Sequence, residues 1–172
     1  MLCVGLCCAG CAQEVSNVGH DSSEEVVLDA ISNQGYLGSN SFRQASRTAF
    51  TSALGDHPDV MNYVTTHSFP WYAKIASDQS NSGVSLTEGA IIVREVLDAQ
   101  GGVAKLTLMV RGAPNSNPSV GDYWFGVTDP NGVPLVVDGQ RQMGQLTACY
   151  SCHQMRASDG YLFGVASSNH MP

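Results

Sequence analysis

Two turn signals in the middle of the chain constrain its fold more than any other feature. The pair Gly101-Gly102 separates β-prone stretches at residues 90–97 and 103–111, a pattern typical of a β-hairpin. A second signal, Asp-Pro-Asn-Gly at 129–132, is typical of a tight turn, and it separates two further β-prone stretches, residues 122–128 and 133–137. The region therefore predicts antiparallel sheet, and it excludes a four-helix bundle, which needs four long amphipathic helices.

Shorter elements are expected before this sheet. Residues 24–33 carry acids in what would be a first helical turn, and residues 41–54 repeat apolar side chains at helical spacing, so both are predicted as helices. Residues 60–66 predict a strand, residues 70–77 one or two helical turns, and residues 78–83 a loop. The fold class is thus α+β, mainly antiparallel sheet with short N-terminal helices.

Charge and hydropathy exclude several functions. The 172 residues include 8 Lys and Arg against 15 Asp and Glu, a net charge of -7. Such an acidic chain lacks the basic surface that binds nucleic acid. No apolar run reaches the roughly 18 residues of a membrane-spanning helix. The length fits one domain, which we place at residues 24–172.

The N-terminus resembles a targeting signal. Residues 1–11 are apolar and uncharged, contain four cysteines and are followed by polar sequence, which is typical of the apolar part of an export signal. The final Cys-Ala-Gly-Cys resembles a bacterial lipoprotein cleavage box with Cys11 as the lipidated residue, although Cys8 stands where leucine is usual. An ordinary signal peptide or an apolar tail remains an alternative. Residues 12–23 are then a flexible tether, and the expected location is the periplasm, or the outer membrane through a lipid anchor.

Near the other end, Cys149, Cys152 and His153 form a C-x-x-C-H motif, the attachment pattern of c-type haem. The spacing suits this chemistry, since two thiols add to the two haem vinyl groups and the adjacent histidine ligates iron. Three alternatives are half of a zinc site, a redox dithiol and a structural disulfide. The sequence has no second ligand pair at zinc spacing and no βαβ context for a redox dithiol. We therefore predict one covalent haem c per chain.

The second axial ligand of such a haem is not specified by the sequence. Methionine or histidine in that position would give a low-spin electron carrier. The side chains considered for this role are Met143, Met155, His57, His67 and His170. Met155 follows His153 too closely to reach the opposite side of the ring with ease.

Three blocks, in this order, resemble the cytochrome P-460 family, which includes the β-sheet cytochromes called c'-β. They are residues 88–95, residues 121–127, and residues 149–153 with 159–164 after them. The resemblance covers about residues 56–165. It implies an antiparallel sheet packed over one haem, often in a homodimer.

Carried over by residue, the resemblance implies that Cys149 and Cys152 hold the haem and that His153 is the proximal ligand. The sixth position would be open to a small nitrogen species such as nitric oxide or hydroxylamine. A redox partner protein would accompany any turnover. Whether the protein is an enzyme, a haem oxidoreductase acting on these molecules, stays undecided by the sequence.

Arg94 departs from the family pattern. Members that oxidise hydroxylamine carry a lysine in the matching strand motif, where it cross-links to the porphyrin. A guanidinium stays protonated and is a poor nucleophile, so the cross-link is in doubt, with Lys105 as a less favoured substitute. Arg94 is expected at a haem propionate or in the distal pocket, or else at the surface paired with Glu95 or a cross-strand acid.

Trp124 and Phe125 are the aromatic candidates for contact with the cofactor. They are adjacent in a predicted strand and therefore lie on opposite faces of the sheet, so we expect one at the haem and the other on the far side. Either side chain alone is also consistent with an ordinary core position. An aromatic wall poor in water would favour a neutral gas over an anion.

Overall fold

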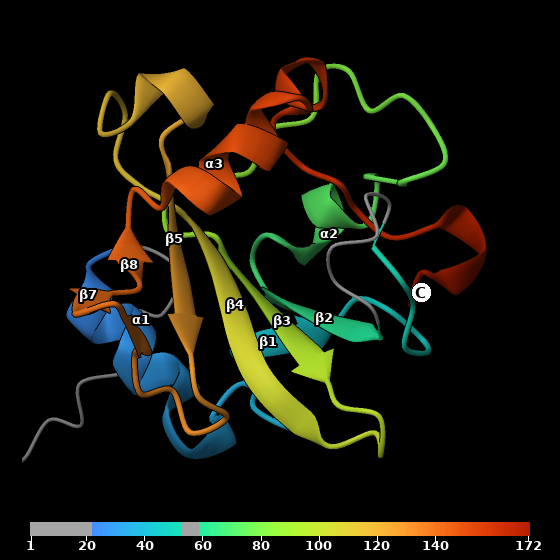
Figure 1. Ribbon diagram of the computed structural model, residues 1–172. Coiled ribbons are helices and arrows are strands. Elements are labelled where there is room, and N and C mark those ends of the chain that lie inside the picture. The colour runs from blue at the N-terminus through green and yellow to red at the C-terminus, as the bar shows by residue number, and fades with distance from the viewer. Residues whose placement is uncertain (1–21, 53–58) are drawn as a thin grey trace, which may run out of the picture.

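One antiparallel sheet organises the protein. The structure is a computed structural model that describes residues 22–52 and 59–172. Within them the main sheet has six strands in the order β1-β2-β3-β4-β5-β8 (Figure 1). The strands are β1 (Phe42–Gln44), β2 (Val60–Thr65), β3 (Ile91–Leu97), β4 (Val103–Arg111), β5 (Tyr123–Thr128) and β8 (Met143–Gly144). This confirms the α+β class with a mainly antiparallel sheet.

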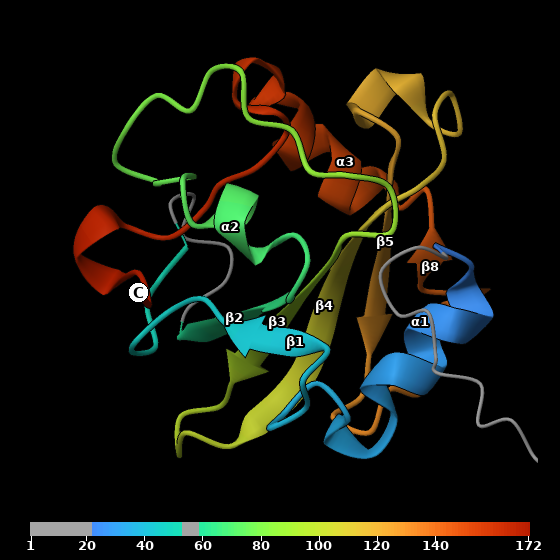
Figure 2. The same cartoon turned by 180° about the vertical axis from the view of Figure 1, so that it is seen from behind.

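Short helices lie on both sides of this sheet. Helix α1 (Glu24–Ile31) packs on one face, while α2 (Phe69–Tyr72) and α3 (Thr147–Gln154) lie over the other (Figures 1 and 2). Single 3-10 turns are η1 (Ser32–Gln34), η2 (Pro118–Val120), η3 (Ala157–Asp159) and η4 (Ser167–Asn169), and a small separate ribbon pairs β6 (Val136–Val137) with β7 (Gln140–Arg141).

The two faces of the sheet carry separate apolar clusters. Strand alternation places odd and even positions of β3 on opposite sides, so that Val93 joins the cluster under α1 and Ile92 joins the cluster under α2 and α3. We call these the α1 face and the α3 face. The α1 face is closed by Val27 and Ile31 of α1, both fully buried. The α3 face holds the candidate site.

Most elements expected from the sequence are confirmed. The helix at 24–33, the strands at 60–66, 90–97, 103–111 and 122–128, and the turn at Gly101-Gly102 all occur within one or two residues of their expected bounds. The helical turn at 70–77 is present as α2, which ends at Tyr72.

The helix predicted over residues 41–54 is wrong. Its first residues form β1, which pairs with β2 from Phe42↔Thr65 to Gln44↔Tyr63, and Phe50 bridges Val60 farther along. The β1 backbone gains its hydrogen bonds from the otherwise unpaired edge of β2, and serine and threonine are weak helix formers. Tertiary pairing has overridden the helical spacing of the apolar residues.

The second hairpin is confirmed only at its base. Thr128 bridges Pro134, and the Leu135 amide donates to the Val127 carbonyl at 2.9 Å. The last part of the predicted strand, Val136–Val137, instead pairs with β7. This ribbon takes exposed valines away from the main sheet.

Several expectations fall on residues outside this description. The export segment with Cys11, most of the tether at 12–23, and His57 lie outside the described residues. Among the residues that are described, no helix has the length and apolar character needed to cross a membrane.

Candidate functional site

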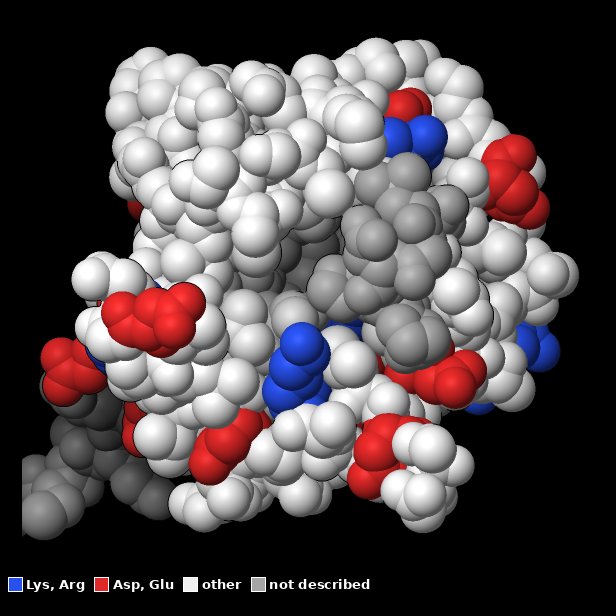
Figure 3. Space-filling model, in the orientation of Figure 1, with Lys and Arg blue, Asp and Glu red and all other residues white. Residues whose placement is uncertain are grey.

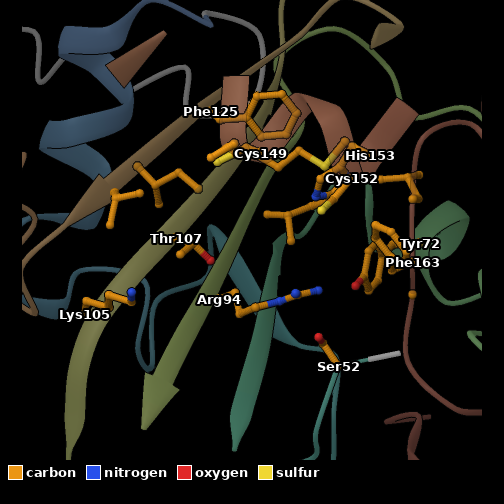
Figure 4. A pocket seen from close by; sticks show the side chains of 17 residues that line it. Ser52, Tyr72, Arg94, Lys105, Thr107, Phe125, Cys149, Cys152, His153 and Phe163 are labelled. Atoms are coloured by element: carbon orange, nitrogen blue, oxygen red, sulfur yellow. The ribbon is translucent and has the colours of Figure 1, made fainter. Parts of the chain in front are cut away.

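A cavity of about 350 Å³ lies on the α3 face. Its walls come from α2, from β3 to β5, from α3 and from the segment after α3 (Figure 4). The surface in the view of Figure 3 is hollowed near the middle. The lining side chains are Ser52, Tyr72, Ile92, Arg94, Lys105, Thr107, Leu108, Met109, Phe125, Val127, Ala148, Cys149, Cys152, His153, Leu162 and Phe163, with Gly164.

The C-x-x-C-H motif lies on α3 and faces this cavity. Cys149, Cys152 and His153 stand at positions i, i+3 and i+4 of one helix, a spacing that places all three on one helical face. All three are half-buried and line the cavity. The structure has no disulfide between the two cysteines.

His153 is oriented by the chain that follows α3. Its Nδ1 lies 2.7 Å from the Tyr161 carbonyl oxygen. A carbonyl only accepts, so we assign the proton to Nδ1 and leave Nε2 as the nitrogen with a lone pair. A backbone carbonyl that fixes the tautomer in this way is the usual partner of a metal-ligating histidine.

Two aromatic rings hold the imidazole in place. The Phe125 and Phe163 ring centroids each lie 5.1 Å from that of His153, the first tilted and the second edge-on. These distances are typical of aromatic pairs. The ring of His153 is therefore clamped between β5 and the segment after α3.

Close backbone packing shapes the segment that carries Tyr161 and Phe163. A Cβ at Gly160 would lie 2.3 Å from the Val84 carbonyl oxygen, and one at Gly164 would lie 2.3 Å from that of Ile75. Both glycines also adopt positive φ, 66° and 65°, which side chains disfavour. Residues 159–164 therefore need glycine at positions 160 and 164 in order to pack beside His153.

The environment of Cys149 does not favour a reactive thiolate. Burial raises the pKa of its thiol, Cys152 raises it further, and the charge of Lys105 opposes both effects. Redox dithiols usually need a thiol with a lowered pKa. The redox alternative is therefore disfavoured.

The zinc alternative finds no support either. Within residues 22–52 and 59–172, no three His, Cys, Asp or Glu side chains converge well enough to hold a metal ion. A structural zinc site needs four such ligands in a tetrahedron.

Two rows of paired residues cross the sheet beneath the cavity, which is lined by Ile92, Met109 and Phe125 from the first row and by Arg94, Thr107 and Val127 from the second. One row runs Val64, Ile92, Met109 and Phe125, and the next runs Asn62, Arg94, Thr107 and Val127. The first row reaches the C-x-x-C-H motif at Phe125, whose ring contacts that of His153. A flat ligand with an apolar body and a polar end suits this arrangement.

Arg94 lies in the cavity wall, so the predicted surface pairing with Glu95 is wrong. Adjacent strand residues point to opposite faces, and the Glu95 carboxylate is on the α1 face with Tyr36 and Tyr63. The Arg94 Nε instead donates to the Asn62 Oδ1 at 3.1 Å. Arg94 therefore lines the cavity, and its expected place at a haem propionate or in a distal pocket stays a prediction.

Lys105 and the two aromatic candidates are also placed. Lys105 also lines the cavity, two residues before Thr107 on β4 and on the same side of that strand. Phe125 lines it as well, whereas Trp124 packs on the α1 face and donates from Nε1 to the Ser22 carbonyl at 3.1 Å. The prediction that the two side chains lie on opposite faces of the sheet is confirmed, with Phe125 on the cavity side and Trp124 on the far side.

The side chains considered as second axial ligands lie elsewhere. Met143, Met155, His67 and His170 do not line the cavity; Met143 packs on the α1 face and Met155 is 65% exposed. Met109, which does line the cavity, was not considered. The alternation of β4 places Met109 on the same side as Lys105 and Thr107, and this pattern could have identified Met109 as a cavity residue. Tyr72 and Ser52 were missed because distant segments bring them to the cavity.

No protein-family model, curated protein or solved structure matches this chain.

Proposed function

We propose that the protein is an exported monohaem c-type cytochrome of the P-460 and c'-β type. Cys149 and Cys152 would hold the haem, and His153 would ligate its iron. The observation that supports this most is that all three motif residues line one cavity. Its remaining walls are largely apolar, as a buried haem requires.

The residues present fit this group in three respects. The two thiols and the imidazole are on one face of α3. The imidazole already has the carbonyl partner that orients an axial ligand. The cavity, of about 350 Å³, presents the apolar side chains of Ile92, Met109 and Phe125 next to the imidazole, as the apolar body of a ring requires.

The proposed activity is binding or conversion of a small nitrogen species. The iron of a bound haem would supply the affinity for nitric oxide or hydroxylamine. This chain's residues would exclude water through Ile92 and Met109, and would orient the ligand through polar groups of the neighbouring row. Arg94 makes a porphyrin cross-link from that strand position unfavourable, since its guanidinium stays protonated; Lys105 remains the candidate for one.

Met109 favours a second candidate function. It is the methionine that lines the cavity among the described residues. Ligation of iron by its thioether would make a low-spin electron carrier. The two functions predict different iron coordination in the same protein.

The test is production of the full chain in bacteria with the c-type maturation system. Haem that stays with the polypeptide in a denaturing gel would support attachment, and its absence would overturn the proposal. Oxidised and reduced absorption spectra are then recorded before and after adding nitric oxide. High-spin bands that respond to nitric oxide support the open site.

The variant Met109→Leu separates the two functions. Leucine keeps the volume but removes the sulfur, a swap that usually costs under about 1.5 kcal/mol. Sharp low-spin bands in the wild type that become high-spin in Met109→Leu would establish the electron carrier instead. Digestion and mass spectrometry of the haem peptide would reveal any bond to Lys105. Export, lipidation of Cys11 and homodimer formation stay predictions for the same preparation.

A further inference from the structure

The cavity wall contains a cation without an acidic partner. Arg94 forms an ion pair with none of the carboxylates in residues 22–52 and 59–172. Its nearest sequence neighbour of opposite charge, Glu95, is on the other face of the sheet and accepts from two tyrosines. Burial lowers the pKa of Arg94 and outweighs the opposing effect of Tyr72, because desolvation disfavours the charged form.

Arg94 is nevertheless held firmly by a fully buried amide. Asn62 accepts from the Arg94 Nε at 3.1 Å through Oδ1, and its Nδ2 donates to the Tyr72 hydroxyl at 2.9 Å. Arginine nitrogens only donate, which fixes the orientation of the amide. Asn62 is also anchored by its backbone, whose amide donates to the Ser46 hydroxyl at 3.1 Å.

This arrangement aims hydrogen-bond donors at one part of the cavity. Figure 4 shows the Arg94 guanidinium extending toward the Tyr72 hydroxyl. The Tyr72 oxygen accepts from Asn62, so its own proton can be donated to a ligand. Burial raises the pKa of Tyr72 and outweighs the opposing effect of Arg94, which keeps that proton in place at neutral pH.

An isolated charge taken out of water is costly unless it is paired. We propose that Arg94, positioned by Asn62 and assisted by Tyr72, binds a negatively charged oxygen or nitrogen group of the molecule that fills this cavity. The inference refines the proposed function, because an aromatic, water-poor wall alone would favour a neutral gas. It uses the haem of that function as its spectroscopic reporter.

Two sources can supply the same negative charge. One is a carboxylate of the haem itself, and the other is a small anion such as nitrite bound beside the iron. Both would pair with the guanidinium through charge-assisted hydrogen bonds. They differ in one respect: an anion dissociates and its affinity can be titrated, whereas a haem carboxylate stays and its own pKa responds.

The experiment compares wild-type holoprotein with Arg94→Gln, Arg94→Lys and the control Arg111→Gln. Arg111 is on the same sheet but outside the cavity and is paired with Asp122 at 3.8 Å. Equal haem staining first establishes that each variant folds and matures. Ferric protein is titrated with azide and nitrite, and with imidazole at pH 8 as a neutral probe.

For a bound anion, Arg94→Gln should weaken azide and nitrite about tenfold or more and imidazole less than about twofold. Arg94→Lys should recover much of the loss, and Arg111→Gln should resemble the wild type. For a haem carboxylate, the anion affinities stay unchanged. The pKa of that carboxylate, measured from the pH dependence of the reduction potential, instead rises by about one unit or more in Arg94→Gln. If neither the anion affinity nor this pH dependence changes, the inference is overturned.

Failure of the proposed function would be recognised separately. If the wild type carries no haem, the haem-free protein is unfolded by heat with and without nitrite or acetate. A binding anion raises the melting temperature by mass action. A rise in the wild type that is lost in Arg94→Gln supports the anion site without haem, and equal behaviour of both proteins contradicts it.

Discussion

The two faces of the sheet treat buried charge in opposite ways. On the α1 face the Glu95 carboxylate, 5% exposed, accepts from the Tyr36 and Tyr63 hydroxyls at 2.8 and 3.3 Å. On the α3 face its neighbour Arg94 has an amide partner but no acid among the described residues. The chain satisfies one charge internally and leaves the other to a ligand.

The same contrast appears in the packing. Helix α1 closes its face with Val27 and Ile31, which are fully buried against Val93 and Leu106. Helix α3 instead has no buried residue and turns half-buried thiols and an imidazole toward a cavity. One sheet thus supplies a core on one side and a site on the other, so variants on the two faces should separate stability from cofactor binding.

The largest expected effect comes from the α3 face. The double variant Cys149→Ala, Cys152→Ala removes both thiols that line the cavity, and covalent haem should be lost completely. His153→Ala should keep a covalent adduct but lose the native spectrum, since its axial nitrogen is gone. Gel staining and absorption spectra measure both. Covalent haem in the double variant would show that Cys149 and Cys152 are not the attachment residues.

On the α1 face, Tyr36→Phe should reduce stability without changing the haem. The hydroxyl donates to a buried carboxylate at 2.8 Å, and a hydrogen bond to a charged group contributes about 1.5–3 kcal/mol. Urea unfolding should show a loss of that size with an unchanged m-value. Tyr63→Phe should cost less, because its bond is longer at 3.3 Å. Altered haem loading in either variant would contradict the separation of the faces.

Local patterns in the sequence correctly predicted most strands of the main sheet. The paired glycines marked the hairpin, and the β-prone stretch at residues 103–111 became β4, whose alternation puts Lys105, Thr107 and Met109 on one face. The error at residues 41–54 arose because their helical spacing carries no information about the edge of β2, which is free to pair with them. Such long-range pairing is decided by tertiary structure.

The candidate site likewise has a part that local sequence predicts and a part that depends on tertiary structure. The motif at Cys149, Cys152 and His153 was visible because its chemistry needs a fixed local spacing. The links from Asn62 to Arg94 and Tyr72 were not, since they join residues 32 and 10 positions apart on different elements. The pairing of Arg94 with Glu95 was a reasonable expectation from charge alone, but strand alternation excludes it.

Adjacent residues on β5 offer a matched pair of variants. Phe125→Leu removes the ring that lies 5.1 Å from His153, so we expect a shifted haem spectrum and about 1 kcal/mol of lost stability. Trp124→Phe loses one hydrogen bond to Ser22 on the α1 face, and its haem spectrum should match the wild type. Absorption spectra and urea unfolding of both variants measure this. Equal spectral shifts in the two variants would show that the faces are coupled.

The smallest effect concerns alkaline pH. Burial raises the pKa of Tyr123 on the α3 face to about 12, despite the opposing charge of Arg111, against an ordinary value of 10.0. The folded state therefore disfavours the tyrosinate, and this contribution is fully present below pH 10 and is lost as the pH rises toward 12. At pH 10.5 the loss amounts to about 0.8 kcal/mol. Tyr63 on the α1 face shifts in the same direction, also to about 12, so Tyr123→Phe should remove only part of the alkaline decline. Urea unfolding at pH 8 and 10.5 measures that part, and an unchanged decline in the variant would mean that Tyr123 is solvated in the folded protein.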